Sequence, residues 1–195
     1  MSGPGRVGAR LASWGWDYLV VVAGLALFFV VVGLPQLLGW WDLSGIWVNQ
    51  WAADVAITVL TVVPYLIYLV VSEAQDPHAT WGKLKAGLRV VGRDGGPPRL
   101  SQVVTRDMIK VLPWQFGHMG AVRLINTSGA DPAGTWLAIA SMVVLVLIVA
   151  PILIGKAGIH DLWGGTRVAA VVSEPRVRGK GSPRPRRGSR PTLRR

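Results

Sequence analysis

Long apolar runs separated by short polar segments are the main pattern of this sequence. Residues 18–38, 54–71 and 136–155 are almost entirely apolar, and each run is about as long as the roughly 17–25 residues that a transmembrane helix requires. Residues 11–82 contain no Lys or Arg. A soluble domain would not need three such segments, so the pattern predicts an all-α, polytopic membrane protein.

The placement of the charges predicts the topology. Basic residues precede the first run, occupy 83–123 and follow residue 155, whereas 35–51 and 126–134 contain none. Lys and Arg concentrate in the cytoplasmic segments of membrane proteins. We therefore expect a multi-pass protein of the cell membrane whose N-terminus, residues 72–100 and C-terminus are cytoplasmic.

Two termini on one side of the membrane require an even number of crossings. The remaining candidate is 102–125, which carries Arg, Asp, Lys and His along its length and a proline at position 113. This segment is either a straight span or a re-entrant or tilted helix that other helices shield from lipid. The expected architecture has about four membrane-spanning or re-entrant helices, near 11–39, 53–72, 102–125 and 135–156.

Two further segments belong to the cytoplasmic side of this topology. In "GLRVVGRDGGPPRLS" a β-branched run precedes Asp-Gly-Gly-Pro-Pro, which predicts a short β-hairpin-like connection or a tight turn. Residues 173–195 are rich in Pro, Gly, Ser and Arg and predict a disordered basic cytoplasmic tail. Basic clusters beside a membrane attract anionic lipids, which we expect as partners of the tail.

The composition and the motif content predict which partners, cofactors and activities this chain lacks. The net charge is +11 although only 16% of residues are charged, and much of the excess lies in the tail, so we expect the lipid bilayer and no nucleic acid as the partner of the folded part. The chain has no Cys and no metal-ligand spacing, Ser-His-Asp arrangement or HExxH motif. We therefore expect no metal, no cofactor and no enzymatic activity.

Ionisable residues within the apolar runs are the candidates for chemistry. Arg10 and Asp17 share one helix face about 10 Å apart, because seven residues are about two helical turns. A carboxylate costs about 2.5–3.5 kcal/mol at a bilayer centre, so we expect Asp17 to be paired with Arg10 or with another cation. In the four-helix topology the other embedded charges gather at the same membrane face: Glu73, Arg106, Asp107, His160 and Asp161.

These residues resemble the motifs of the RDD family of bacterial membrane proteins. An arginine opens the first transmembrane helix, an aspartate lies inside it, and a late His-Asp is followed by Gly-Thr-x-Val. The family's arginine and first aspartate map onto Arg10 and Asp17, and its second aspartate maps onto Asp161, in "HDLWGGTRV" with Thr166. The resemblance extends from about residue 10 to 172, so we expect an RDD-like transmembrane domain over residues 1–172.

The connecting segment also resembles the family. A Thr-x-Gly-Lys motif, formed by Thr80, Gly82 and Lys83, leads into "GLRVV" and "DGG" and then into a helix that bears an arginine. His78 and Trp81 depart from the family, which has small residues or proline at these positions. The resemblance implies a membrane location, transport of unidentified ligands and, for some members, cation/proton exchange.

The functional candidates are Arg10, Asp17 and Asp161, and each has two interpretations. Arg10 is either a snorkelling topology anchor or the partner of a carboxylate. Asp17 either carries an ion or proton or belongs to a structural ion pair. His160 and Asp161 form either a proton relay or a cap that closes the fourth helix. The supporting candidates are Glu73, Arg106, Asp107, His160 and Thr166.

Two functions from different classes remain open. One is a small ion or solute transporter that uses Asp17 as its coupling site, with Arg10 and Asp161 tuning the proton affinity. Four helices are few for a transport path, so this hypothesis includes a homo-oligomer. The other is a non-catalytic membrane scaffold or assembly partner in which buried ion pairs define the helix register.

Overall fold

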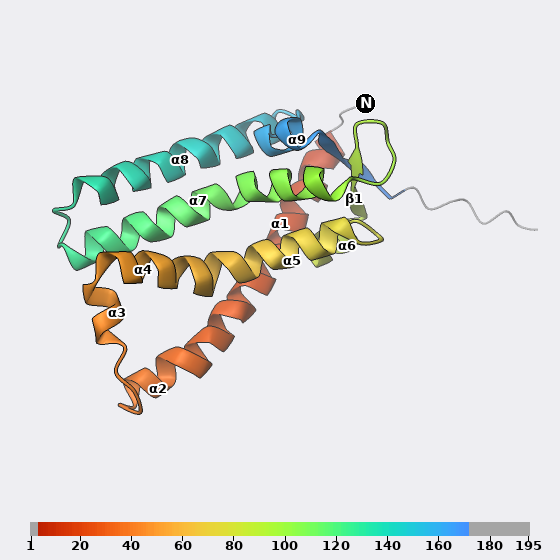
Figure 1. The fold of residues 1–195 in the computed structure, drawn as a ribbon. Helices are drawn as coiled ribbons and strands as arrows, with labels where there is room; N and C mark the ends of the chain where they lie inside the picture. Colours follow the sequence, from red (N-terminus) through yellow and green to blue (C-terminus); the bar gives the residue numbers. More distant parts are fainter. Residues whose placement is uncertain (1–3, 172–195) are drawn as a thin grey trace, which may run out of the picture.

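Four long helical rods make up most of the structure, a computed structural model that describes residues 4–171 (Figure 1). The first rod is α1 (Pro4–Phe28), η1 (Phe29–Gly33) and α2 (Leu34–Leu37). After the short α3 (Ser44–Val48), the second rod is α4 (Gln50–Ile57), η2 (Thr58–Val62) and α5 (Val63–Ala74). The third and fourth rods are α7 (Leu100–Asn126) and α8 (Pro132–Leu153).

The rods correspond to the predicted helices, and the helical membrane fold is confirmed. Val7–Leu37, Gln50–Ala74 and Pro132–Leu153 are long and apolar enough to cross a membrane. Helix α7 has 27 residues, between the 22 and 31 residues of these candidates, but it is more polar. Successive rods run back and forth, so the start of α1 and the end of α8 lie at the same end of the bundle (Figure 1). We call this the sheet end, because it carries the β-strands.

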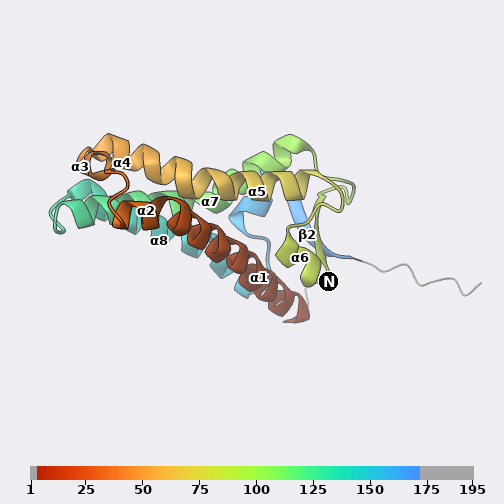
Figure 2. The same ribbon diagram turned by 90° about the horizontal axis from the view of Figure 1, so that it is seen from below.

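Helix α1 leans away from the other three rods. It packs against α6 (Trp81–Lys85) at the sheet end (Figure 2) and crosses the second rod at an angle, so that the two rods separate in the view of Figure 1 toward the opposite end. Only 6% of its apolar window is buried inside the molecule. Most of α1 therefore presents its apolar side chains outward, as expected of a helix surrounded by lipid.

Two prolines account for the π-helical turns in the first two rods. Pro35 and Pro64 each follow a π turn by two residues, after Gly33 and Val62 respectively. A proline has no N–H, and its ring displaces the carbonyl four residues earlier. The backbone accommodates this by shifting to five-residue hydrogen bonds, such as that from the Val63 N–H to the Thr58 carbonyl.

Small residues bring α7 and α8 into backbone contact. A Cβ added at Gly120 would lie 2.9 Å from the Gly134 carbonyl oxygen and 2.9 Å from the Ala138 nitrogen. The Ser141 hydroxyl donates a 2.8 Å hydrogen bond to the Pro113 carbonyl. Close approach at small residues is the usual way in which helices associate in lipid, so α8 shields one side of the polar α7.

The predicted β structure is present, but a hairpin within 87–101 is wrong. Strand β1 (Leu88–Gly92) pairs antiparallel with β2 (Thr166–Ala170), from Leu88 opposite Ala170 to Gly92 opposite Thr166. A tight turn does follow β1, with the Gly95 N–H bonded to the Gly92 carbonyl at 3.0 Å. The residues after it include two prolines, which cannot donate to a ladder, and the β-branched segment after α9 (Ile159–Gly164) supplies the partner strand.

Candidate functional site

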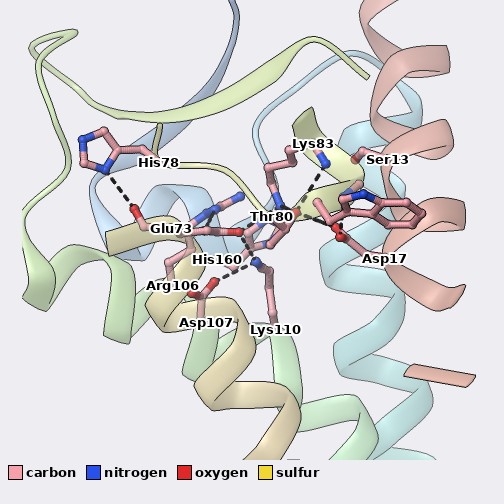
Figure 3. Close-up of polar contacts among 12 residues, drawn as sticks. Ser13, Asp17, Glu73, His78, Thr80, Lys83, Arg106, Asp107, Lys110 and His160 are labelled. Atoms are coloured by element: carbon pink, nitrogen blue, oxygen red, sulfur yellow. Dashed lines mark hydrogen bonds and ion pairs between the residues drawn. The ribbon is translucent and has the colours of Figure 1, made fainter. Parts of the chain in front are cut away.

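Charged side chains are among the most deeply buried groups of the described chain. Glu73, Asp107 and Asp161 are fully buried, and Arg106 is 1% exposed. They come from α5, α7 and α9, which meet at the sheet end (Figure 3). Helices that face lipid outward thus enclose a polar centre, where buried charges have to be paired.

Glu73, in the last turn of α5, is the centre of this charge network. Its Oε1 lies 2.8 Å from Lys83 Nζ and 3.0 Å from Lys110 Nζ, and its Oε2 accepts a hydrogen bond from Arg106. Three cations from α6 and α7 therefore surround one carboxylate. Since removal of one partner of a buried pair leaves an uncompensated charge, Glu73 ties α6 and α7 to the end of α5.

Arg106 joins three elements. Besides Glu73, it contacts Asp161 of α9, with 3.0 Å between Nε and Oδ1. Helix α9 reaches α7 because of Gly164, where an added Cβ would lie 2.8 Å from Arg106 Cβ and 2.9 Å from the Gln102 carbonyl oxygen. This contact explains the first glycine of the "HDLWGGT" motif.

Asp17 is held by hydrogen-bond donors from α5 and α6. Its Oδ1 accepts bonds from the Tyr68 hydroxyl at 2.9 Å and the Gly82 N–H at 2.8 Å, and its Oδ2 accepts the Thr80 hydroxyl at 2.7 Å (Figure 3). The Lys83 ammonium lies 4.0 Å from Oδ2. Asp17 therefore caps the start of α6 from a different helix.

This geometry explains the Thr-x-Gly-Lys motif. Thr80 is the N-cap of α6, and its side chain also accepts the Lys83 N–H. A Cβ at Gly82 would lie 2.1 Å from the Ser13 carbonyl oxygen, so only glycine lets α6 approach α1 this closely. Lys83 completes the motif by pairing with Glu73. Burial lowers the pKa of Lys83, and the nearby Glu73 carboxylate partly offsets this effect.

Asp17 was expected to pair with Arg10 or with another cation, and the structure gives the second of these pairings. Arg10 Nη1 instead lies 3.9 Å from Asp161 Oδ2 and 3.3 Å from the Lys156 carbonyl oxygen. Among residues 4–171, the cation within ion-pair distance of Asp17 is Lys83. Burial opposes the ionisation of Asp161, but Arg106 outweighs it and lowers the pKa of Asp161. The family's arginine and second aspartate thus meet each other.

His160 does not have the titration that a relay near neutral pH requires. Burial lowers its pKa to about 3, although the adjacent Asp161 carboxylate acts in the opposite direction. The ring is therefore neutral at physiological pH. Neither His160 nor Asp161 closes the fourth helix, because both lie in α9, which is separate from α8. Thr166 is buried at the start of β2, and its hydroxyl has no hydrogen-bond partner among the described residues.

The charges of the network balance. Its ion pairs join four acidic and four basic side chains: Asp17, Glu73, Asp107 and Asp161 with Arg10, Lys83, Arg106 and Lys110. Asp107 is the least saturated member. Its Oδ1 lies 2.7 Å from Lys110 Nζ without hydrogen-bond geometry, and its Oδ2 has no hydrogen-bond partner among the described residues.

A cavity of about 210 Å³ adjoins the network between α1, α5, α7 and α8. Asp17, Lys110 and His160 are among the residues that line it, together with the aromatic Trp14 and Trp114. A small solute or several waters could therefore reach two charged members of the network from this cavity.

Two members of the network, Lys110 and Lys83, were not predicted from the sequence as site residues. Lys110 follows Arg106 and Asp107 by four and three positions, so the three share one face of α7. That spacing could have identified it. Lys83 was noticed as part of a motif, but its pairing with Glu73 depends on the fold of the connecting segment.

Comparison with known protein families identifies the family of this chain. The model of the RDD family matches residues 4–165. The chain belongs to the RDD family. No curated protein and no solved structure matches the chain. All three residues identified by resemblance to the RDD family, Arg10, Asp17 and Asp161, lie in or beside the charge network. No metal-binding group of three or more His, Cys, Asp or Glu exists within residues 4–171.

Proposed function

We propose that this RDD-family chain is a multi-pass transporter of small ions in the cell membrane, with its sheet end and both termini in the cytoplasm. Exposed Lys85, Arg89, Arg93, Arg99 and Arg167 lie in the segments of the sheet end, whereas residues 35–51, in the loop at the opposite end, contain no Lys or Arg. This distribution supports the orientation through the positive-inside rule.

The observation that carries the transport proposal is the balanced charge network beside the cavity. In a low-dielectric site, a proton or cation that binds one carboxylate leaves a surplus positive charge. The surplus favours the loss of another cation or proton from the same network. This is the electrostatic condition for exchange, and Asp17 is the proposed coupling site because it borders the cavity from within a bilayer-length helix.

The alternative is a non-enzymatic membrane scaffold. The contacts of Asp17 with Thr80 and the Gly82 N–H favour it, because they attach α6 to α1. In this interpretation the buried charges define how the helices pack, and the outward face of α1 contacts lipid or a second copy of the chain. A transporter moves ions across the membrane, whereas a scaffold does not, and this difference can be measured.

Flux measurements on purified protein in liposomes test the proposal. Vesicles that contain a pH-sensitive dye are given an inward gradient of Na⁺, K⁺ or Li⁺, and we expect the internal pH to change with wild-type protein and not in protein-free vesicles. The Asp17→Asn variant should insert and elute like the wild type but give no flux. The matched control is Asp42→Asn, which alters an exposed aspartate outside the network. Absence of flux from folded wild type, or full flux from Asp17→Asn, contradicts the transporter with Asp17 as coupling site.

A further inference from the structure

A stripe of polar side chains follows one face of the second rod. Asp54, Thr58, Thr61, Tyr65 and Tyr68 are spaced by four, three, four and three residues, so they form one continuous helical face. This face meets α7, the polar helix. We call the interface between this stripe and α7 the polar seam.

The end of the polar seam opposite the charge network carries a second set of charges. Asp54 is buried, and it accepts hydrogen bonds from Arg123 of α7 and from Gln50 Nε2 at 3.1 Å. Arg123 Nη1 also lies 3.6 Å from Asp131 Oδ2, next to the start of α8. A buried aspartate with an arginine partner therefore lies at each end of the helix bundle.

Polar contacts continue through the middle of the seam. Gln115 Nε2 donates a 2.7 Å hydrogen bond to the Thr58 hydroxyl oxygen. His118, three residues after Gln115 in α7, has its Nδ1 3.5 Å from the hydroxyl oxygen of Thr61, three residues after Thr58 in the second rod. Both threonines belong to the π turn η2, and such turns occur frequently at functional sites.

Aromatic side chains connect the middle of the seam to the charge network. The ring of Trp114 lies 5.4 Å from that of His118 and 6.4 Å from that of Tyr65, measured between centroids. Tyr65 stacks on Tyr68 at 6.2 Å, and the Tyr68 hydroxyl donates to Asp17. Side chains that can exchange hydrogen bonds with water thus recur from Asp54 to Asp17.

Helix contacts in lipid do not require this chemistry. The α7–α8 interface shows that small residues are sufficient for close packing here. Polar groups at bilayer depth are costly and mark ion or proton pathways when they face the interior of a bundle. Two of the seam side chains, His118 and Gln115, come from the helix that is too polar to count as a candidate span.

We propose that the polar seam is a water-accessible pathway for protons between the Asp54–Arg123 pair and the charge network at Asp17. The inference rests on the proposed transport function, for which it names the transferred species and the route. His118 is the titratable group midway. Its imidazole takes up one proton at one ring nitrogen and releases one from the other, so the ring is neutral again after each transfer.

Cysteine accessibility tests the seam without any assay of transport. The chain has no Cys, so single cysteines can be placed in the seam by Thr58→Cys, Thr61→Cys and His118→Cys. Val59→Cys is the matched control, since Val59 lies at the same depth and is 53% exposed on the lipid-facing side. Ser44→Cys, in the exposed loop region, is the positive control.

A small cationic methanethiosulfonate reagent is applied to the full-length protein in liposomes. Only the thiolate reacts, and it forms in water, so we expect seam cysteines to react at least about tenfold faster than Val59→Cys. If Ser44→Cys reacts and no folded seam variant exceeds Val59→Cys, the seam is dry and the inference is wrong, whatever the flux. If the seam cysteines react but the wild-type protein shows no flux, the proposed transport function is wrong, whereas the inference that water enters the seam still holds.

Discussion

Single buried residues in this protein each contact several parts of the chain. Asp17 accepts hydrogen bonds from α5 and from the start of α6, and Asp161 contacts Arg10 and Arg106. In a medium where an unpaired charge is costly, such a residue decides which segments pack together. A substitution of such a residue should therefore lower the free energy of unfolding mainly because it leaves the partners of that residue unpaired.

The pH dependence of stability tests the burial of His160. Its pKa is about 3 in the folded protein and about 6.5 in the unfolded chain. Between these values the unfolded state binds more protons, so the unfolding free energy should fall as the pH is lowered from 6.5, by up to about 1.4 kcal/mol per unit. Denaturant unfolding in detergent between pH 4.5 and 6.5 measures this slope. His160→Gln should reduce it, and an unchanged slope contradicts the assignment.

Double-mutant cycles test the partner of Arg10. Arg10 Nη1 lies 3.9 Å from Asp161, so Arg10→Ala and Asp161→Asn should show an interaction energy of about 0.5–3 kcal/mol. Arg10→Ala and Asp17→Asn should be nearly additive in unfolding free energy. A larger interaction energy in the second cycle than in the first would restore the pairing that the sequence predicted.

At the scale of the elements, the sheet end is assembled from segments that are remote in the chain. Strand β1 pairs with β2, α6 lies against α1, and α9 lies against α7. The two helix contacts depend on glycines at the points of closest approach, Gly82 between α6 and α1 and Gly164 between α9 and α7. Small residues at the crossings and charges in the centre together hold short elements that have little apolar surface of their own.

Gly82→Ala tests the contact between α6 and α1. The added Cβ would lie 2.1 Å from the Ser13 carbonyl oxygen, so the helices have to separate, at a cost of about 1–3 kcal/mol. We expect a lower Tm in detergent and weaker protection of the α6 amides from hydrogen exchange. Gly24→Ala is the control, because nothing lies within 4 Å of its added Cβ. Equal Tm values for the two variants would contradict the close contact.

At the scale of the whole molecule, an outward apolar surface surrounds a polar interior. Polar contacts extend from Asp54 at one end to Asp17 at the other. The more apolar rods lie on either side of α7 (Figures 1 and 2). This arrangement lets α7 occupy the bundle although its charges would be too costly for a helix exposed to lipid.

Impermeant thiol labelling in intact cells tests the topology. Ser44→Cys and Ser128→Cys lie in exposed segments at the end opposite the sheet, and we expect both to be labelled from outside. Ser189→Cys lies in the basic tail, outside the described residues, and should be labelled only after the cells are opened. Labelling of Ser189→Cys in intact cells would reject the four-segment topology and favour three crossings.

Binding to vesicles tests the basic tail, which also lies outside the described residues. Clustered Lys and Arg contribute about 1 kcal/mol each near an anionic surface, so a peptide of residues 176–195 should bind anionic vesicles at low salt and be released at high salt. Co-sedimentation measures the bound fraction, with neutral vesicles as the control. If the peptide does not bind anionic vesicles at low salt, the expectation that anionic lipids are partners of the tail is wrong.

The sequence alone determined the helical membrane class and the end of the molecule at which the charges gather. Both follow from features that can be read along the chain without knowing the fold, namely the length of each apolar run and the distribution of Lys and Arg. For residues 102–125 the charges along the segment left two alternatives open, a straight span and a re-entrant or tilted helix shielded by other helices.

Only the tertiary structure decided which groups meet. From the sequence, either Arg10 or another cation could pair with Asp17; in the fold Asp17 contacts α6 and its Lys83, whereas Arg10 lies beside Asp161. Residues 87–101 were expected to form a hairpin or a tight turn; the tight turn is present, but the strand 88–92 pairs with 166–170. The physical reason is the same in both cases. A buried charge or an unpaired strand takes the partner that the packed helices bring within reach, and that distance depends on how remote segments pack rather than on the spacing of residues along one helix or loop.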